Sequence, residues 1–211
     1  NLQEILSDGM NLPASISNLD STNMNNRISH IVYTSGTTGN PKGCISSLSS
    51  LLYYIHAKNT AHGITEASNV FLASALPFDP CLSDVIATFF ANATLCISSR
   101  QVVQNSLASV LINLEATHIL CTPSLWSGVE GETKGVLGKL EVVALGGEMI
   151  PASIRRFWGR RQASLEDESC RNIKHRNIKL FCTYGVTEAC VYQTITEVFC
   201  DDPVPAKGQE I

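Results

Sequence analysis

Residues 33–43 read YTSGTTGNPKG and begin at the end of an apolar run, HIVY at 30–33. Glycines let the backbone approach a ligand closely, Ser and Thr hydroxyls add hydrogen-bond donors, and a lysine supplies a cation for phosphate oxygens. The pattern therefore predicts a phosphate-binding loop that contains Ser35, Gly36, Thr37, Thr38, Gly39 and Lys42. The alternative interpretation is an ordinary surface turn, since Gly, Ser and Asn are frequent in turns.

Two well-known nucleotide loops do not match this stretch. The P-loop has the form GxxxxGK[ST], but here Lys42 lies between Pro41 and Gly43. The dinucleotide fingerprint GxGxxG is also absent, because Asn40 and Pro41 follow the second glycine. A P-loop NTPase and a Rossmann dehydrogenase are therefore both excluded.

Strand-like and helix-like segments alternate outward from this loop. The predicted strands are RISHIVY (27–33), NVFLASAL (69–76), ATLCIS (93–98), THILCT (117–122), LEVVAL (140–145) and IKLFCTYG (178–185). Apolar residues at helical spacing predict helices over 44–61, from Pro80 to Phe90, over 103–114, and after Pro151. We therefore expect an α/β fold with a mostly parallel sheet and helices on both faces. A charged segment at 165–177 is expected to be a solvated insertion.

Ligands of open α/β sheets bind at the carboxyl ends of the strands. Three glycine-bearing stretches follow predicted strands: the loop after a buried strand at 27–33, GGE at 146–148, and TYGVTE at 183–188. We expect them to form one site. A helix that begins near Cys44 would add its dipole to the phosphate loop.

Composition limits the classes of partner. With 44% hydrophobic and 16% charged residues and a net charge of -4, the chain is expected to be globular and to bind neither nucleic acid nor membrane. It lacks an apolar run of 18 residues and a signal-peptide pattern, so we expect a cytoplasmic protein. Its eight cysteines form no CxxC pair and are expected to be reduced core thiols.

The three motifs, in this order, resemble the signature of the adenylate-forming (AMP-binding) enzyme superfamily. The resemblance is closest to adenylation domains like those of nonribosomal peptide synthetases, including the aminoadipate- and β-alanine-activating group. It implies that residues 27–211 are a partial large N-terminal domain, truncated before the C-terminal lid domain. Residues 1–26, rich in Asn and Ser, are expected to be a loosely ordered lead-in.

The resemblance also implies roles for individual residues around ATP and Mg²⁺. Lys42, Thr187 and Glu188 would be catalytic, with Thr187 at the α-phosphate and Glu188 on Mg²⁺. The nucleotide-binding residues would be Thr34, Ser35, Gly36, Thr37, Thr38, Gly39 and Lys42 over the outer phosphates, and Gly146, Gly147, Glu148, Thr183, Tyr184, Gly185 and Thr187 around the adenine and α-phosphate. Taken alone, GGE is also consistent with a simple turn, and Glu188 with a carboxylate at a helix N-terminus.

Two positions depart from the family pattern. Cys182 stands where the family usually has an Asn that meets the adenine amino group, which makes adenine selectivity less certain. Val186 stands where the family usually has Pro, and we expect little consequence from this change.

The stretch LPFDPCLSD at 76–84 concerns the acid that is activated. Its Phe-Asp pair resembles amino-acid-activating domains, in which the Asp pairs with the substrate ammonium, with Phe78 as a gate and Asp79 as the amine-binding residue. The same alignment gives a modest, mostly apolar acid pocket lined by Ser83, Leu120, Leu145, Thr183, Val191 and Tyr192. The alternative is that Asp79 only caps the following helix.

The resemblance implies ATP-dependent activation of a carboxylic acid, favoured as an amino acid, to an acyl-adenylate. The acyl group would pass to a thiol, either of CoA or of a carrier-protein phosphopantetheine. Two alternatives stay open: a fatty or aryl acid–CoA ligase, and a non-catalytic nucleotide-binding module.

Overall fold

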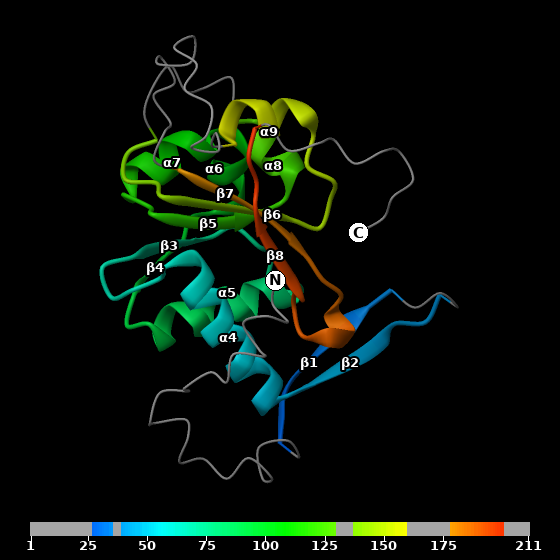
Figure 1. The fold of residues 1–211 in the computed structure, drawn as a ribbon. Coiled ribbons are helices and arrows are strands. Elements are labelled where there is room, and N and C mark those ends of the chain that lie inside the picture. The colour runs from blue at the N-terminus through cyan, green and yellow to red at the C-terminus, as the bar shows by residue number, and fades with distance from the viewer. Residues whose placement is uncertain (1–26, 36–38, 130–136, 160–177, 201–211) are drawn as a thin grey trace.

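The computed structural model describes residues 27–35, 39–129, 137–159 and 178–200 (Figure 1). Its main sheet has six strands in the order β4-β3-β5-β6-β7-β8. The strands are β3 (Asn69–Leu72), β4 (Thr94–Cys96), β5 (His118–Cys121), β6 (Val142–Gly146), β7 (Lys179–Tyr184) and β8 (Thr194–Glu197). The first five are parallel to one another and β8 is antiparallel to β7. The predicted mostly parallel sheet is therefore confirmed.

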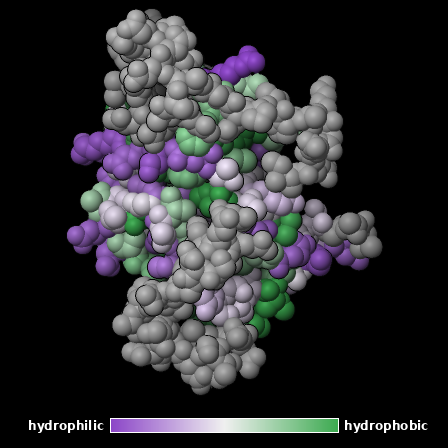
Figure 2. Space-filling model, viewed as in Figure 1, coloured by the Kyte–Doolittle hydropathy of each residue, from purple (hydrophilic) through white to green (hydrophobic). Residues whose placement is uncertain are grey.

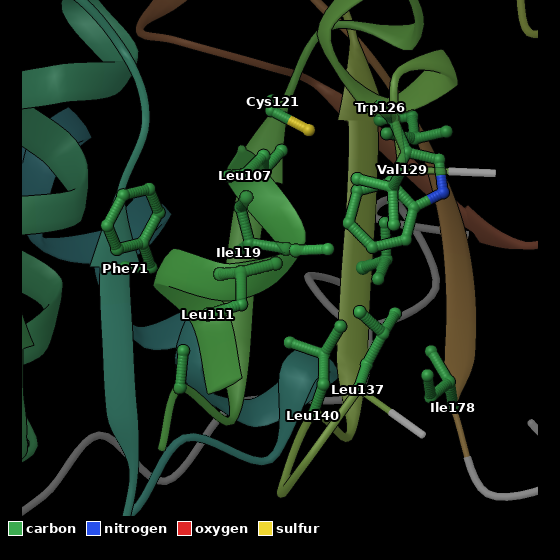
Figure 3. Close-up of a cluster of buried hydrophobic side chains, with 14 of the residues drawn as sticks. Phe71, Leu107, Leu111, Ile119, Cys121, Trp126, Val129, Leu137, Leu140 and Ile178 are labelled. Carbon is green, nitrogen blue, oxygen red and sulfur yellow. The ribbon is translucent and has the colours of Figure 1, made fainter. Parts of the chain in front are cut away.

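Helices cover both faces of this sheet (Figure 1). One face carries α4 (Leu48–His62) and α5 (Asp79–Phe90), and the other carries α6 (Arg100–Asn105), α7 (Leu107–Asn113), α8 (Pro123–Ser127) and α9 (Ala152–Trp158). Successive side chains of a strand point to opposite faces, so each strand contributes to two cores. In β6, Val143 and Leu145 belong to the larger cluster shown in Figure 3, whereas Val142 and Ala144 belong to a cluster that includes Leu51 of α4.

Three elements of the main sheet and its covering helices differ from the sequence prediction. The helix predicted over 103–114 is two helices, α6 and α7, because Ser106 between them has an extended backbone with φ -161°. Neither α8 nor β8 was predicted: Thr122 caps α8 by accepting from the Leu125 amide, and β8 forms a hairpin with β7. The predicted lead-in at 1–26 and insertion at 165–177 lie outside the described residues.

The chain around the phosphate loop folds as a separate hairpin. β1 (Ile28–Thr34) pairs antiparallel with β2 (Lys42–Ser47), and Thr34 lies opposite Lys42. The prediction of a helix from Cys44 is therefore wrong. The β-branched Ile45 pairs with Ile31 in the ladder, and the helix begins only at Leu48, where Ser47 caps it by accepting from the Ser50 amide at 3.1 Å. The helix that follows this loop therefore begins only after the whole of β2.

The prediction that 27–33 is a buried strand is also wrong. Ile28, Ile31 and Tyr33 of β1 are exposed, Tyr33 to 70%, and none of the other residues of the strand is fully buried. Ile31 and Tyr33 lie over Gly43, where an added Cβ would be 3.4 Å from each of them. Together with Ile28 and Ile45 they leave hydrophobic surface along the hairpin, part of which is visible in Figure 2. A two-stranded sheet has no second layer of its own to bury this face.

A buried ion pair joins the two helices on one side of the sheet. The Lys58 ammonium of α4 contacts the Asp84 carboxylate of α5, and both side chains are almost completely buried. Thr88 extends the contact by donating its hydroxyl to the carbonyl of Asp84 at 2.6 Å. Charges this far from water are retained in folded proteins when they are paired, so the pair specifies how α4 and α5 lie against each other.

Five of the seven described cysteines, Cys44, Cys81, Cys96, Cys121 and Cys190, are buried free thiols. Burial raises the pKa of Cys121, which keeps its thiol protonated. The prediction of core thiols is confirmed for these five residues, whereas Cys182 and Cys200 are only partly buried and Cys170 lies outside the described ranges. None of the helices within those ranges is long and apolar enough to cross a membrane.

Candidate functional site

The three sequence motifs meet at one end of the sheet. GGE follows β6 and TYGVTE follows β7, and these strands are neighbours with Gly146 opposite Thr183. The phosphate loop arrives from the β1–β2 hairpin rather than from a strand of the sheet, and β2 packs against η2 (Thr187–Ala189). The Nζ atom of Lys42 consequently lies 3.4 Å from Oε1 of Glu188.

The phosphate loop is described at its two ends. Thr34 is part-buried, Ser35 is exposed, and Gly39 has φ +86°, a left-handed conformation that favours glycine. Gly36, Thr37 and Thr38 lie outside the described residues. The Thr34 hydroxyl lies 3.7 Å from the Cys44 sulfur in the opposite strand.

Glu188 is an exposed carboxylate beside an exposed cation. The side chain of Lys42 is 63% exposed and that of Glu188 48%. The backbone amide of Glu188 and, after it, the hydrogen bond from Lys42 lower the pKa of Glu188, so its carboxylate is ionised at neutral pH.

Two glycines of the GGE turn are required by their surroundings. A Cβ on Gly146 would lie 2.3 Å from the Thr183 hydroxyl oxygen, whose hydrogen is donated to the Leu145 carbonyl at 3.2 Å. Gly147 has φ +80°. The strand next to β6 ends at Tyr184, which is 51% exposed.

Glu148 has a contact that the sequence did not predict. Its Oε2 accepts from the backbone amide of Ser124 at 3.1 Å and also from the Ser124 hydroxyl, so the GGE turn is tied to α8. Cys182 is part-buried and packs against the larger hydrophobic cluster, where burial raises the pKa of its thiol. Its side chain is therefore partly covered by the larger cluster.

The loop from β7 to β8 carries Thr187 and Glu188 and is tightly folded. A Cβ on Gly185 would lie 2.1 Å from the Cα of Tyr192, so only glycine fits there. Cys190 and Val191 have φ +68° and +67°, a strained conformation for residues with a Cβ that costs about 1–3 kcal/mol each. Gln193, which sequence reasoning missed, bonds to this loop at several points.

Asp79 is the first residue of α5 and not its cap. The N-cap position is Phe78, and no side-chain hydrogen bond caps this helix. The Asp79 side chain is buried, with 6% of the residue exposed, while the neighbouring Phe78 is largely exposed. A carboxylate at this position can still interact favourably with the helix dipole.

The buried carboxylate of Asp79 is only partly compensated by its neighbours. Burial raises the pKa of Asp79, although the Thr187 side chain, the backbone amides of Asp79 and Val191, and His30 oppose the rise. Its Oδ2 atom is buried and has no hydrogen-bond partner among the described residues. An unpaired buried carboxylate oxygen is costly, and a cationic ligand would satisfy it.

The residues predicted for the acid pocket divide between the two faces of the sheet. Leu120, Val191 and Tyr192 share the cluster on the α4–α5 face, whereas Leu145 points into the larger cluster on the opposite face. Ser83 is fully buried on α5, one turn beyond Asp79, and its hydroxyl lies 3.3 Å from that of Tyr54. Ser83 and Tyr192 therefore both contact Tyr54, whereas the Leu145 side chain lies on the opposite face of the sheet.

Tyr54 is a further residue of this region that sequence reasoning missed. Its ring meets that of Tyr192 edge-on, with centroids 4.9 Å apart. The helical spacing that marks Leu51 as buried also places Tyr54, three residues later, on the same face. That spacing could have identified Tyr54 as a buried residue of this region.

The residues fit a metal that is shared with phosphates rather than held by protein alone. Within the described ranges there is no group of three or more His, Cys, Asp or Glu side chains that could hold a metal ion. Mg²⁺ usually takes one or two carboxylates and completes its shell with water and phosphate oxygens. Glu188, exposed and ionised beside the phosphate loop, suits this kind of binding.

Comparison with known proteins places the chain in a family. The AMP-binding enzyme family matches residues 6–209. Malformin synthetase mlfA from Aspergillus sclerotiicarbonarius is 31% identical over 80% of the chain, and nonribosomal peptide synthetase 6 from Cochliobolus heterostrophus is 29% identical over 85%. The matched region spans only 3% and 9% of these two proteins.

Solved structures show the same fold. The Vibrio cholerae adenylation domain AlmE, in complex with glycyl-adenosine-5'-phosphate, superposes with a TM-score of 0.70 at 19% identity, covering 84% of this chain and 31% of AlmE. The o-succinylbenzoate CoA synthetase MenE from Bacillus subtilis gives 0.65 at 24% identity, covering 82% of this chain and 32% of MenE. The chain belongs to the AMP-binding family of adenylate-forming enzymes.

Proposed function

We propose that this protein activates an amino acid by ATP-dependent adenylation and passes the acyl group to a thiol. The substrate carboxylate attacks the α-phosphorus of ATP, the bond to the β-phosphate oxygen breaks, and pyrophosphate leaves with that bond's electron pair. The acceptor thiol is that of CoA or of a carrier-protein phosphopantetheine. The region that carries the activity is 27–211, as part of an adenylation core.

The observation that carries this proposal is the meeting of Lys42 and Glu188, which come from two different motifs. Lys42 provides a positive charge for the outer phosphates, and Glu188 would hold Mg²⁺, which neutralises phosphate charge when bound. The hydroxyl of Thr187, the neighbour of Glu188, would turn from Asp79 to donate to the α-phosphate when the nucleotide is bound. Catalysis of this kind depends on alignment and charge neutralisation rather than on a nucleophile of the protein.

The nucleotide base is assigned to the surface beside GGE and Tyr184. The missing side chains of Gly146 and Gly147 permit a flat ligand to approach the backbone. Tyr184 offers the exposed ring on which adenine would stack. Glu148 fixes this turn through Ser124 and contributes its backbone rather than its carboxylate, which is already occupied.

The choice of an amino acid rests on Asp79. Its buried carboxylate has an unpartnered oxygen among the described residues and faces Thr187, so an ammonium bound there would sit next to the reacting end of the nucleotide. AlmE, which shares the fold, was solved with an aminoacyl-adenylate. This supports the proposal without defining the amino acid.

Amino-acid-dependent ATP–pyrophosphate exchange by the full-length protein tests the proposal. A panel of amino, fatty and aryl acids separates the candidates: exchange with amino acids is the expected result, and exchange with fatty or aryl acids alone would favour an acid–CoA ligase. Calorimetric binding of MgATP with no exchange for any acid would indicate a nucleotide-binding module without catalysis.

A further inference from the structure

The loop between β7 and β8 is held by one side chain, that of Gln193. Its Oε1 accepts from the backbone amide of Val186 at 3.0 Å, and its Nε2 donates to the carbonyl of Ala189 at 3.0 Å. Its backbone amide donates to the carbonyl of Tyr184 at 2.9 Å. The orientation of the side-chain amide is determined by these partners, because a peptide N–H can only donate and a carbonyl can only accept.

The two side-chain contacts of Gln193 lie on either side of Thr187 and Glu188 in the chain. Val186 immediately precedes η2, and Ala189 is its last residue, so the contacts bracket Thr187 and Glu188. Within that segment the Ala189 amide donates to Val186 at 3.0 Å, and the Cys190 amide donates to Thr187 at 3.3 Å. A turn this short has few hydrogen bonds of its own, so a side chain that joins both its ends restricts where Glu188 can lie.

The backbone angles of the next two residues also indicate a restrained loop. Cys190 and Val191 both have left-handed φ angles, a conformation that persists for residues with a Cβ only when the surroundings enforce it. Gln193 follows within two residues and ties the chain back to Tyr184, Val186 and Ala189. The same loop presents the Val191 amide and Thr187 to Asp79, so it joins the nucleotide side and the acid side of the site.

We propose that Gln193 is a positioning residue for the adenylation site, which holds Glu188 in the orientation that a phosphate-bound Mg²⁺ requires. It acts through the loop and does not itself contact substrate or metal. The proposal rests on the proposed function, because it assumes that Glu188 is the metal ligand. Side chains that orient a metal ligand typically contribute roughly 10- to 100-fold in metal affinity or activity.

The test is Gln193→Met, which keeps the length of the side chain and removes both hydrogen bonds. The dissociation constant of a nonhydrolysable ATP analogue in the presence of Mg²⁺ is measured by calorimetry on the full-length protein, together with the melting temperature. We expect binding about tenfold weaker, largely restored at high Mg²⁺, and faster hydrogen exchange of the Val186 amide. Gln104→Met, an exposed glutamine of α6, is the matched control and should leave all three unchanged.

A purely structural role of Gln193 would lower the melting temperature without changing the dissociation constant of the folded protein, and that result would overturn the proposal. If Gln193→Met does not fold at the assay temperature, Gln193→Asn replaces it, because its shorter side chain cannot reach both partners. The variant Glu188→Gln distinguishes the positioning role of Gln193 from the metal-binding role of Glu188. Weak binding by Glu188→Gln with normal binding by the Gln193 variants overturns the positioning role alone, and normal binding by both overturns the metal role of Glu188.

Discussion

Lys42 and Glu188 are separated by 146 positions in the chain, yet their charged groups lie 3.4 Å apart. Lys42 is the first residue of β2, and Glu188 is the middle residue of η2. The contact joins the small β1–β2 hairpin to the main sheet at the end where β6 and β7 finish. Exposed ion pairs contribute little to folding stability, so we do not expect the fold to depend on this one.

Removal of this pair should affect nucleotide binding and not folding. We expect Lys42→Ala and Glu188→Ala each to weaken MgATP binding about 10- to 100-fold, because each loses a charged contact to phosphate or metal. Calorimetry measures the affinity, and thermal melting should show little change. Lys139→Ala is a matched control, since Lys139 forms an equally exposed pair with Glu115 at 2.9 Å, remote from the motifs. Equal effects of Lys139→Ala and Lys42→Ala would contradict the assignment.

Asp79→Asn should discriminate among substrates. The amide keeps the size of the side chain but cannot neutralise a buried ammonium, which costs about 3 kcal/mol and corresponds to roughly 100-fold in kcat/KM for the amino acid. Pyrophosphate exchange measures this value. The des-amino analogue of the same acid serves as the control substrate, and its much lower kcat/KM should be the same in both proteins. A parallel loss for the two substrates would show that Asp79 acts on the fold rather than on the amine.

Removing one partner of the buried pair Lys58–Asp84 should lower the stability of the fold, whereas replacing both partners should cost much less. We expect Asp84→Asn to reduce the free energy of unfolding by about 3–5 kcal/mol, because it leaves the Lys58 charge buried and unpaired. The double variant Lys58→Met, Asp84→Leu should recover most of this loss, since both charges are gone. Urea unfolding gives the values, with the exposed Lys139→Met as control. A double variant no more stable than Asp84→Asn would show that the helices need the charges themselves.

Two buried histidines should make stability fall in mild acid. His118 donates its Nε2–H to the His62 carbonyl at 3.1 Å, and its Nδ1 lies 2.7 Å from the Thr117 hydroxyl. Burial lowers the pKa of His118 and, with Lys58 nearby, lowers that of His62 further. The unfolded chain therefore binds more protons below about pH 6.5, and stability is lost as pH falls through that value, by up to about 1.4 kcal/mol per pH unit for each histidine.

Urea unfolding between pH 7.5 and 5.5 measures this slope. His118→Gln keeps hydrogen-bonding groups and removes the titration, so its stability should depend less on pH than that of the unsubstituted protein. Burial raises the pKa of Asp79 and Asp84, and these groups act in the opposite direction, but both proteins contain them and the difference isolates His118. An identical slope in the two proteins would rule out the histidine contribution.

Much of the main sheet was predictable because its signals are local. Val142 to Leu145 form an apolar run long enough for one buried strand, and turn residues stand on both sides of it. The helix of α5 follows from apolar residues at helical spacing after Pro80. The antiparallel β8 was missed because its sequence, TITE, has too few apolar residues to mark a strand without its partner β7.

The hairpin was mispredicted for a similar reason. Residues 44–61 have apolar side chains at helical spacing, and nothing in the first four of them rules out a helix. Residues 44–47 are extended because β1 offers them hydrogen-bonding partners. These two strands pair only in the folded hairpin, so the local sequence does not reveal the contact. Tertiary context of this kind regularly overrides local propensity.

The sequence by itself determined which chemistry is present. Glycines, hydroxyls and a lysine in one order, with GGE and TYGVTE downstream, resemble the signature of the AMP-binding family closely enough to identify it. Only the tertiary structure decided which side chains share a site. Lys42 contacts Glu188, and Leu145 lies on the opposite face of the sheet from Tyr192. Gln193 bonds to both ends of the segment that contains Thr187. These relationships depend on strand register and on backbone angles distant in sequence, and periodicity along the chain does not encode them.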